Sequence, residues 1–183
     1  MKNKCINPRF DKERKINTTR KIAILGSTGS IGRNTLDIVD KYPKLFQVIA
    51  LSAHRNIKLL EEQIDKYNPK YVAVTDIDLI DEIRGKITGF TKIIDSKNAL
   101  SEIASINEID TIVNAVVGFS GLAPTLTGLK NGKKIALANK ESLVTGGDLI
   151  REYEREYNGI IIPIDSEHSA LLSLLYNHYQ KDI

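Results

Sequence analysis

The fold is decided by residues 21–32, which read Lys-Ile-Ala-Ile-Leu-Gly-Ser-Thr-Gly-Ser-Ile-Gly. The apolar run Ile22–Leu25 ends at a glycine, as a buried parallel strand does. Gly26, Gly29 and Gly32 then recur at three-residue spacing, and the residues that follow have helical periodicity. A strand, a glycine-rich turn and a helix in this order predict a site for the phosphates of a dinucleotide.

Each glycine of this turn has a separate expected role. We expect Gly26 to take the tight turn, Gly29 to let a pyrophosphate approach the backbone, and Gly32 to let the helix pack closely on the strand. The free N–H groups at the start of the helix would then face the phosphates. The spacing is G-x-x-G-x-x-G rather than the commoner G-x-G-x-x-G, so an ordinary glycine-rich turn remains the alternative.

Length and composition are those of a soluble globular protein with one domain and a sizeable core. The chain has 183 residues, of which 42% are hydrophobic and 27% are charged. No apolar run approaches the roughly 18 residues that a membrane span needs, so we expect no membrane association. The single cysteine, Cys5, cannot form an internal disulfide and suits a reducing compartment, which predicts a cytoplasmic location.

The positive net charge lies in the first 20 residues. Residues 1–20 contain seven Lys or Arg and two acids, a net charge of +5, so residues 21–183 carry −2 although the whole chain carries +3. A weakly acidic body argues against a nucleic-acid partner. Residues 1–20 also lack the apolar segment of a secretory signal, and we expect them to form a disordered basic leader.

Strand and helix patterns alternate along the rest of the chain. Strands are expected at 22–25, 47–52, 71–75, 92–95, 111–117, 134–138 and 160–164, and helices at 34–42, 56–67, 78–84, 99–105, 122–131, 147–157 and 169–179. This alternation predicts an α/β fold: a Rossmann-like, doubly wound and mostly parallel sheet with helices on both faces. Ligands of such sheets lie outside the carboxyl ends of the strands, so the residues after each strand are the candidates for chemistry.

The segment after the second strand favours NADP over NAD. It reads Ala53-His54-Arg55-Asn56, where an NAD-specific site usually has an acid that binds the ribose hydroxyls. The guanidinium of Arg55 suits a 2′-phosphate by its charge and by its forked donors. Asn56 has a second interpretation, as the cap of the next helix, and the two roles are compatible.

Polar residues also follow two later strands. Asn139-Lys140-Glu141-Ser142 comes after the strand at 134–138, where a fixed cation and hydrogen-bonding side chains would face the ligand crevice. A solvated turn that opens a helix is the alternative. Gly118-Phe119-Ser120-Gly121, after the strand at 111–117, fits either a backbone approach to a nicotinamide ribose or a plain turn.

The last strand is followed by Asp165-Ser166-Glu167-His168. The two carboxylates are two residues apart at a strand tip, so both can point the same way, and hard oxygen ligands suit Mg²⁺ or Mn²⁺. Two carboxylates do not fill an octahedral site, so water, substrate or further ligands must complete it. The alternative is that they are acids favoured at a helix N-terminus, with His168 as a surface residue of the first turn.

Together these motifs resemble the 1-deoxy-D-xylulose 5-phosphate reductoisomerase family of the non-mevalonate isoprenoid pathway. The carriers are Gly26–Gly32, Leu137–Val144 (Leu-Ala-Asn-Lys-Glu-Ser-Leu-Val) and Pro163–Ala170 (Pro-Ile-Asp-Ser-Glu-His-Ser-Ala), and the resemblance runs from about Lys21 to the C-terminus. It implies an NADPH-dependent enzyme that converts 1-deoxy-D-xylulose 5-phosphate, a phosphorylated ketose, to 2-C-methyl-D-erythritol 4-phosphate with a divalent metal, Mg²⁺ or Mn²⁺.

The resemblance also implies a role for each matched residue. The residues implied to bind NADPH are Thr28, Gly29, Ser30 and Ile31 at the phosphates, Arg55 and Asn56 at the 2′-phosphate end, and Asn139 and Glu141. The residues implied to act on the substrate are Lys140 and Ser166 as substrate contacts, Asp165 and Glu167 as metal ligands, and Lys140, Asp165 and Glu167 as the catalytic group. His54 stands where many members have glycine, which leaves its contact open.

Family members are about twice as long as this chain and are expected to be homodimers. The resemblance therefore predicts an N-terminal portion, with a leader at 1–20, an NADPH-binding Rossmann-like domain at 21–158 and the start of a catalytic domain at 159–183. Such a portion is expected to be inactive alone. A module that only binds nucleotide, or another NADP-dependent oxidoreductase with the same domain, is the alternative function.

Overall fold

The structure is a computed structural model that describes residues 18–87, 89–167 and 169–170. Residues 1–17 of the leader expected at 1–20 and residues 171–179 of the final helix expected at 169–179 lie outside these residues, as does His168. The end of the predicted leader belongs to the fold, because the first strand begins at Arg20, whose N–H donates to the Leu45 carbonyl at 2.8 Å.

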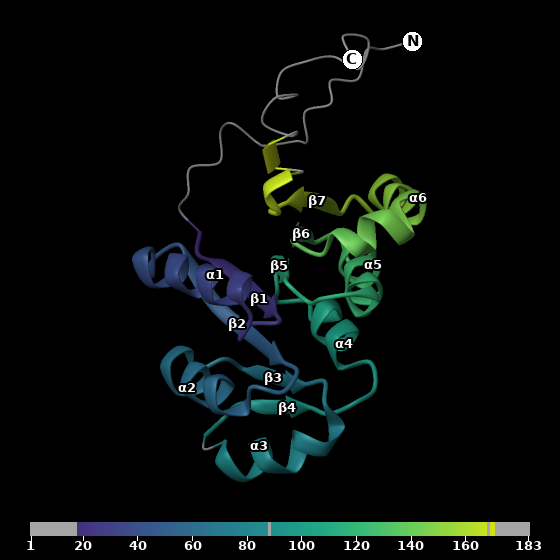
Figure 1. Cartoon of the computed structure of the whole chain (residues 1–183). Coiled ribbons are helices and arrows are strands. Elements are labelled where there is room, and N and C mark those ends of the chain that lie inside the picture. The colour runs from purple at the N-terminus through teal and green to yellow at the C-terminus, as the bar shows by residue number, and fades with distance from the viewer. Residues whose placement is uncertain (1–17, 88, 168, 171–183) are drawn as a thin grey trace, which may run out of the picture.

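Strands and helices alternate as the sequence predicts (Figure 1). The strands are β1 (Arg20–Leu25), β2 (Phe46–Ala53), β3 (Tyr71–Val74), β4 (Lys92–Ile94), β5 (Thr111–Asn114), β6 (Lys134–Leu137) and β7 (Ile160–Pro163). The helices are α1 (Ser30–Lys41), α2 (Ile57–Tyr67), α3 (Ile80–Lys86), α4 (Ala99–Ser105), α5 (Leu122–Lys130) and α6 (Lys140–Tyr157). Two short 3₁₀ turns, Ile77–Leu79 and Phe119–Gly121, precede α3 and α5.

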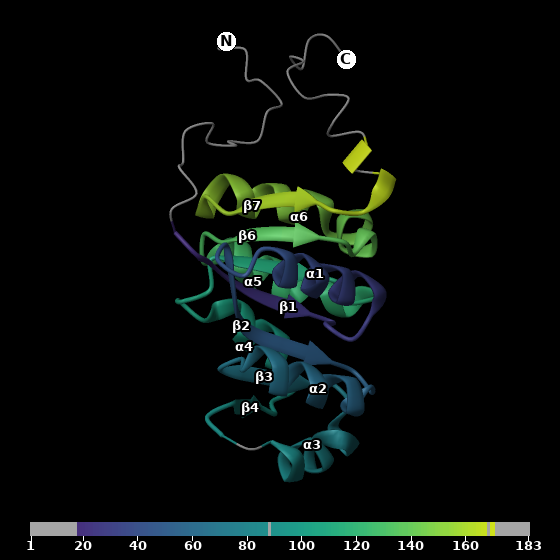
Figure 2. The same cartoon turned by 90° about the vertical axis from the view of Figure 1, so that its left-hand side faces the viewer.

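The strands form one sheet in the order β4-β3-β2-β1-β5-β6-β7, and all six neighbouring pairs are parallel. Figure 2 shows the strands stacked with their arrows pointing the same way. The chain runs outward from β1 in one direction and then returns to its other side with β5. This reversal creates a topological switch point between β1 and β5, and the predicted doubly wound fold is confirmed.

The two faces of the sheet bury separate hydrophobic clusters, because successive side chains of a strand point to opposite faces. In β1, Ala23 and Leu25 belong to the cluster covered by α4, α5 and α6, whereas Ile22 and Ile24 belong to the cluster covered by α1, α2 and α3. Figure 1 shows α1 and α2 on one side of the sheet and α4, α5 and α6 on the other. The near-continuous apolar sequence of β1 therefore follows from its burial on both faces.

Most of the predicted bounds lie within two residues of those observed, and three differ by more. The helix α1 begins at Ser30 rather than at 34. The strand β5 ends at Asn114 rather than at 117, because the buried Asn114 side chain accepts the N–H of Val116 and donates to the Gly121 carbonyl at 2.8 Å, which turns the chain out of the sheet. The helix α6 begins at Lys140 rather than at 147. The helix is interrupted at Gly146, whose φ of −117° is not helical. The predicted range of 147–157 therefore covers only the part of α6 that follows this interruption.

The sheet continues past the domain boundary predicted at residue 158, because β7 pairs with β6 as its seventh strand. The division into domains at 21–158 and 159–183 stays a prediction. Within the residues that the structure describes, no helix is both long enough and apolar enough to cross a membrane.

Candidate functional site

A groove of about 530 Å³ opens at the carboxyl ends of β1, β2, β3 and β5, directly over the switch point. Most of its lining lies at the ends of these four strands or directly after them, including Thr28 and Gly29 of the glycine-rich turn and His54 after β2. This is the position in which doubly wound sheets bind their ligands, and the volume lies in the usual range for small-molecule sites.

Two of the three glycines in the glycine-rich turn have the geometry that the sequence predicts. Gly26 has a φ of +82°, in the left-handed region, and a Cβ there would lie 2.9 Å from the Ala115 carbonyl oxygen. A Cβ on Gly32 would lie 2.4 Å from the Gly26 oxygen and 2.5 Å from the Ser27 Cα, so α1 packs against the turn without room for a side chain. Both glycines are required by the protein's own backbone.

Gly29 differs from these two glycines. It is exposed, its φ of −76° suits any residue, and a Cβ there would meet only the Gly26 oxygen, at 3.4 Å. It is the N-cap of α1, and no side chain caps the first N–H groups of this helix. The surrounding backbone leaves room for a Cβ at this position, so the physical reasons for glycine are its preference over alanine at an N-cap and the close approach of a ligand.

A buried hydrogen-bond network joins the glycine-rich turn to α2 and to the end of β2. The Ser27 hydroxyl donates to Gln63 Oε1 at 2.6 Å, and Gln63 Nε2 donates to the Ser27 carbonyl at 3.0 Å. The hydroxyl oxygen of Ser52, at the end of β2, accepts the Gly26 N–H at 3.0 Å. The sequence does not reveal this role of Gln63, because a polar residue inside a helix gives no sign that it reaches back to a turn 36 residues earlier.

Arg55 is paired with Asp76, an acid that was not among the candidates predicted from the sequence. Its Nε donates to Asp76 Oδ2 at 2.8 Å, and Asp76 follows β3, the neighbour of β2. Arg55 is 75% exposed whereas Asp76 is 16% exposed, and the hydrogen bond from Arg55 lowers the pKa of the Asp76 carboxyl. The interaction uses Nε alone, so the two terminal amino groups of the guanidinium remain to bind an anion.

The residues on either side of Arg55 are also held in place. His54 Nδ1 lies 3.0 Å from the hydroxyl oxygen of Thr75, and both residues line the groove. The Asn56 side chain accepts the Leu59 N–H at 3.2 Å, so its predicted role as the cap of α2 is confirmed. Thr75 and Asp76 come directly after β3. The placement of ligands at the carboxyl ends of strands, which indicated the other candidates, therefore also applies to them.

Asn139 is a buried structural residue at the start of α6. Its Oδ1 accepts the Ser142 N–H at 2.7 Å, and its Nδ2 donates to the carbonyls of Val116 and Gly118, each at 2.6 Å. These bonds occupy both N–H groups of the amide and join the end of β6 to the loop after β5. Glu141, by contrast, is exposed in the first turn of α6. The cofactor contacts of Asn139 and Glu141 stay predictions.

The ends of β6 and β7 bring Lys140 and Glu167 together. Lys140 Nζ lies 3.9 Å from Glu167 Oε1, and the Ser166 hydroxyl donates to Glu167 Oε2 at 2.7 Å. The Ser166 hydroxyl, the backbone N–H of Glu167 and the charge of Lys140 together lower the pKa of the Glu167 carboxyl. The Lys140 and Glu167 side chains are exposed, so this pair adds little to stability and both charges are accessible to a ligand.

The donor set at the end of β7 suits a hard divalent cation but is incomplete. Asp165 and Glu167 supply carboxylate oxygens, and the lowered pKa keeps Glu167 ionised. Over residues 18–87, 89–167 and 169–170, no group of three or more His, Cys, Asp and Glu side chains is placed to hold a metal ion. The residues therefore fit one part of an octahedral site, whose other ligands must come from elsewhere.

The predicted site residues thus fall into two neighbouring regions at the carboxyl ends of the strands. Thr28 and Gly29 line the groove, Ser30 and Ile31 form the first turn of α1, and Arg55 and Asn56 follow β2. Lys140, Asp165, Ser166 and Glu167 gather at β6 and β7.

Comparison with known proteins identifies the family. The family model for 1-deoxy-D-xylulose 5-phosphate reductoisomerase matches residues 22–147, which is more than half of the chain. The chain belongs to this family. Among curated reductoisomerases, that of Thermodesulfovibrio yellowstonii is 44% identical over 85% of this chain, and a Bacillus cereus one is 42% identical over 88%. The matched regions are 41% and 42% of these relatives, so this chain spans about two fifths of their length.

Solved reductoisomerases have the same fold. The enzyme from Zymomonas mobilis in complex with NADPH superposes with a TM-score of 0.82 at 36% identity, over 88% of this chain and 42% of that one. A reductoisomerase in complex with NADPH, fosmidomycin and magnesium superposes with a TM-score of 0.78 at 38% identity, over 81% of this chain and 37% of that one.

Proposed function

We propose that this chain binds NADPH in the groove over the switch point and forms the cofactor-binding part of a 1-deoxy-D-xylulose 5-phosphate reductoisomerase. The observation that carries the proposal is Gly29, a glycine beside which the backbone leaves open space, at the N-terminus of α1 next to this groove. The N–H groups at the start of α1, which no side chain caps, provide a site for the pyrophosphate. Family membership and the NADPH complexes of the related structures support the same assignment.

The 2′-phosphate end would lie at Arg55. Asp76 holds the guanidinium by Nε and leaves its terminal amino groups to the phosphate. An NAD-specific site places its acid where it binds the ribose hydroxyls, whereas here the nearby acid is already paired with Arg55. This arrangement favours NADPH over NADH.

The substrate would bind at the ends of β6 and β7. Asp165 and Glu167 would hold the divalent metal, Lys140 would place a positive charge beside the substrate oxygens, and Ser166 would contact the substrate. The bound metal would polarise the carbonyl and the adjacent hydroxyl of the phosphorylated ketose, and NADPH would supply the hydride. Because β5 and β6 are neighbours in the sheet, the proposed cofactor and substrate regions lie side by side along the carboxyl ends of the strands.

The test is cofactor binding by the 183-residue chain, measured by calorimetry with NADPH and NADH. We expect NADPH to bind more tightly. Arg55→Ala should weaken NADPH binding by roughly 1–3 kcal/mol, about 5- to 150-fold, which is the range for a lost charge-assisted contact, and leave NADH binding nearly unchanged. Arg151→Ala, which removes an exposed arginine of α6 away from the groove, is the matched control. Equal affinities for the two cofactors would contradict the proposed role of Arg55.

Other parts of the family assignment stay predictions for this chain: the conversion of 1-deoxy-D-xylulose 5-phosphate, the homodimer and the cytoplasmic location. A module that binds NADPH without turnover is the second candidate function for the 183 residues. The incomplete donor set among the residues described favours it.

A further inference from the structure

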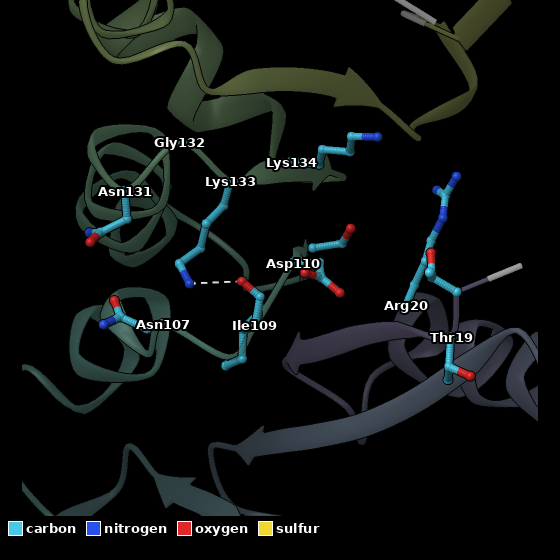
Figure 3. A pocket seen from close by; sticks show the side chains of 11 residues that line it. Thr19, Arg20, Asn107, Ile109, Asp110, Asn131, Gly132, Lys133 and Lys134 are labelled. Atoms are coloured by element: carbon cyan, nitrogen blue, oxygen red, sulfur yellow. Dashed lines mark hydrogen bonds between the residues drawn. The ribbon is translucent and has the colours of Figure 1, made fainter. Parts of the chain in front are cut away.

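A second cavity lies at the amino ends of the strands, opposite to the cofactor groove at their carboxyl ends. It has a volume of about 470 Å³ and is formed where β1, β5 and β6 begin, together with the C-terminal end of α5. Figure 3 shows Asn107, Asn131 and Lys133 on one side of this cavity and Thr19 and Arg20 on the other. Its size suits a small metabolite, and none of the roles proposed above uses it.

Lys133 is the feature that makes this cavity unusual, because lysine is rarely buried without a carboxylate partner. It is only 4% exposed, and its ammonium donates to the carbonyls of Ile106 and Ile109. Figure 3 shows the bond to Ile109, which is 2.8 Å long. An ammonium has three N–H groups, so one remains after these two bonds. Burial lowers the pKa of Lys133, and the nearby charge of Asp110 opposes that change.

Thr111 adds a second unsatisfied group to the lining. It is the first residue of β5, and its hydroxyl oxygen is buried without a hydrogen-bond partner. Leaving such a group unpaired costs roughly 1–3 kcal/mol. Rotation about the Cα–Cβ bond moves the hydroxyl to another staggered position, and the buried hydroxyl of Thr111 would need this rotation to meet an acceptor in the cavity.

The charges of the lining favour an anion with two negative charges. Arg20, Lys133 and Lys134 supply three positive charges, and Asp110 supplies the one negative charge among the lining residues. Asp110 is itself engaged, because its Oδ2 accepts the backbone N–H of Lys21 at 2.9 Å. The lining therefore has a net charge of two positive units.

We infer that this cavity at the amino edge of the sheet is a binding site for a phosphate dianion, either inorganic phosphate or the phosphate group of a small ester. The remaining Lys133 N–H, the Thr111 hydroxyl and the guanidinium of Arg20 would donate to its oxygens. The site is separate from the cofactor groove, because the two lie at opposite ends of the same strands. An anion bound here would join the starts of β1, β5 and β6.

The experiment is calorimetric titration of the 183-residue chain with inorganic phosphate and, separately, with methyl phosphate. Saturable binding of one phosphate per chain is expected. Tighter binding of inorganic phosphate would assign the site to the free anion, and tighter binding of methyl phosphate would assign it to an ester. Absence of saturable binding of both probes would overturn the inference.

Variants locate the bound phosphate. Thr111→Val should weaken binding by about 2- to 10-fold, the range for one neutral hydrogen bond, and should not lower the melting temperature, because the hydroxyl has no partner in the free protein. Lys134→Gln should also weaken binding, whereas Lys92→Gln, at the start of β4 outside the cavity, should leave it unchanged. Arg55→Ala should have no effect. Phosphate binding that is lost in Arg55→Ala and retained in Thr111→Val would place the anion in the cofactor groove and refute the inference.

Discussion

Replacement of Gly29 by alanine tests the central argument for the cofactor site. The fold should accept the substitution, because the φ of −76° and ψ of 173° suit alanine and the new Cβ would have its nearest contact at 3.4 Å. Alanine reduces the freedom of the unfolded chain but is less favourable than glycine at an N-cap, so the free energy of unfolding should change by less than roughly 1 kcal/mol. The effect on NADPH binding should be larger, because the methyl group occupies space that a pyrophosphate needs.

The expected loss of affinity follows from the cost of one extra carbon atom at a close contact. Overpacking by a methyl group costs roughly 1–3 kcal/mol, which corresponds to a loss of about 5- to 150-fold in NADPH affinity. The assay combines calorimetric titration with NADPH and thermal unfolding of the same sample, so binding and stability are measured separately.

Two further glycines provide the controls. Gly32→Ala places its Cβ 2.4 Å and 2.5 Å from backbone atoms of Gly26 and Ser27, so it should destabilise the chain whether or not NADPH is present. Gly85→Ala, in α3, has no atom within 4 Å of the new Cβ and should affect neither property except for a small gain in helix stability. If Gly29→Ala binds NADPH as tightly as the original chain, the proposed approach of the pyrophosphate to this backbone is wrong.

Three other predictions concern the support of the site and its chemistry. Gln63→Leu removes both hydrogen bonds to Ser27 and should lower the free energy of unfolding by roughly 2–4 kcal/mol in urea titrations; an unchanged midpoint would show that the network is not needed. The pKa of Asp76 is lowered in the fold, so its contribution to stability is present above the unfolded-state pKa and is lost as the pH falls below about 4. Asp76→Asn should therefore flatten the stability profile in that acidic range, and a profile that keeps its slope would contradict the pairing. With 1-deoxy-D-xylulose 5-phosphate, NADPH and Mn²⁺, the 183-residue chain should oxidise no measurable NADPH, because Asp165 and Glu167 leave an octahedral metal site incomplete; turnover that Asp165→Ala abolishes would refute this expectation.

The sequence by itself determined the fold class and the place of the cofactor groove. Periodicity and glycine positions are local properties, because the alternation of apolar residues and the sign of φ depend on a few neighbouring residues. Gly26 at a positive φ and Gly32 at a close helix contact could therefore be assigned before any tertiary contact was known. The strand-end rule then located His54, Arg55 and the polar residues after β6 and β7.

Only the tertiary structure decided which of these side chains meet. The salt bridge of Arg55 with Asp76, the contact of Lys140 with Glu167 and the hydrogen bonds of Gln63 to Ser27 each join residues more than twenty positions apart. The first two depend on which strands are neighbours, and the third depends on how α2 packs against the turn after β1. Strand order and helix packing arise from burial of the two faces of the sheet, a property of the whole chain that no short stretch of sequence contains.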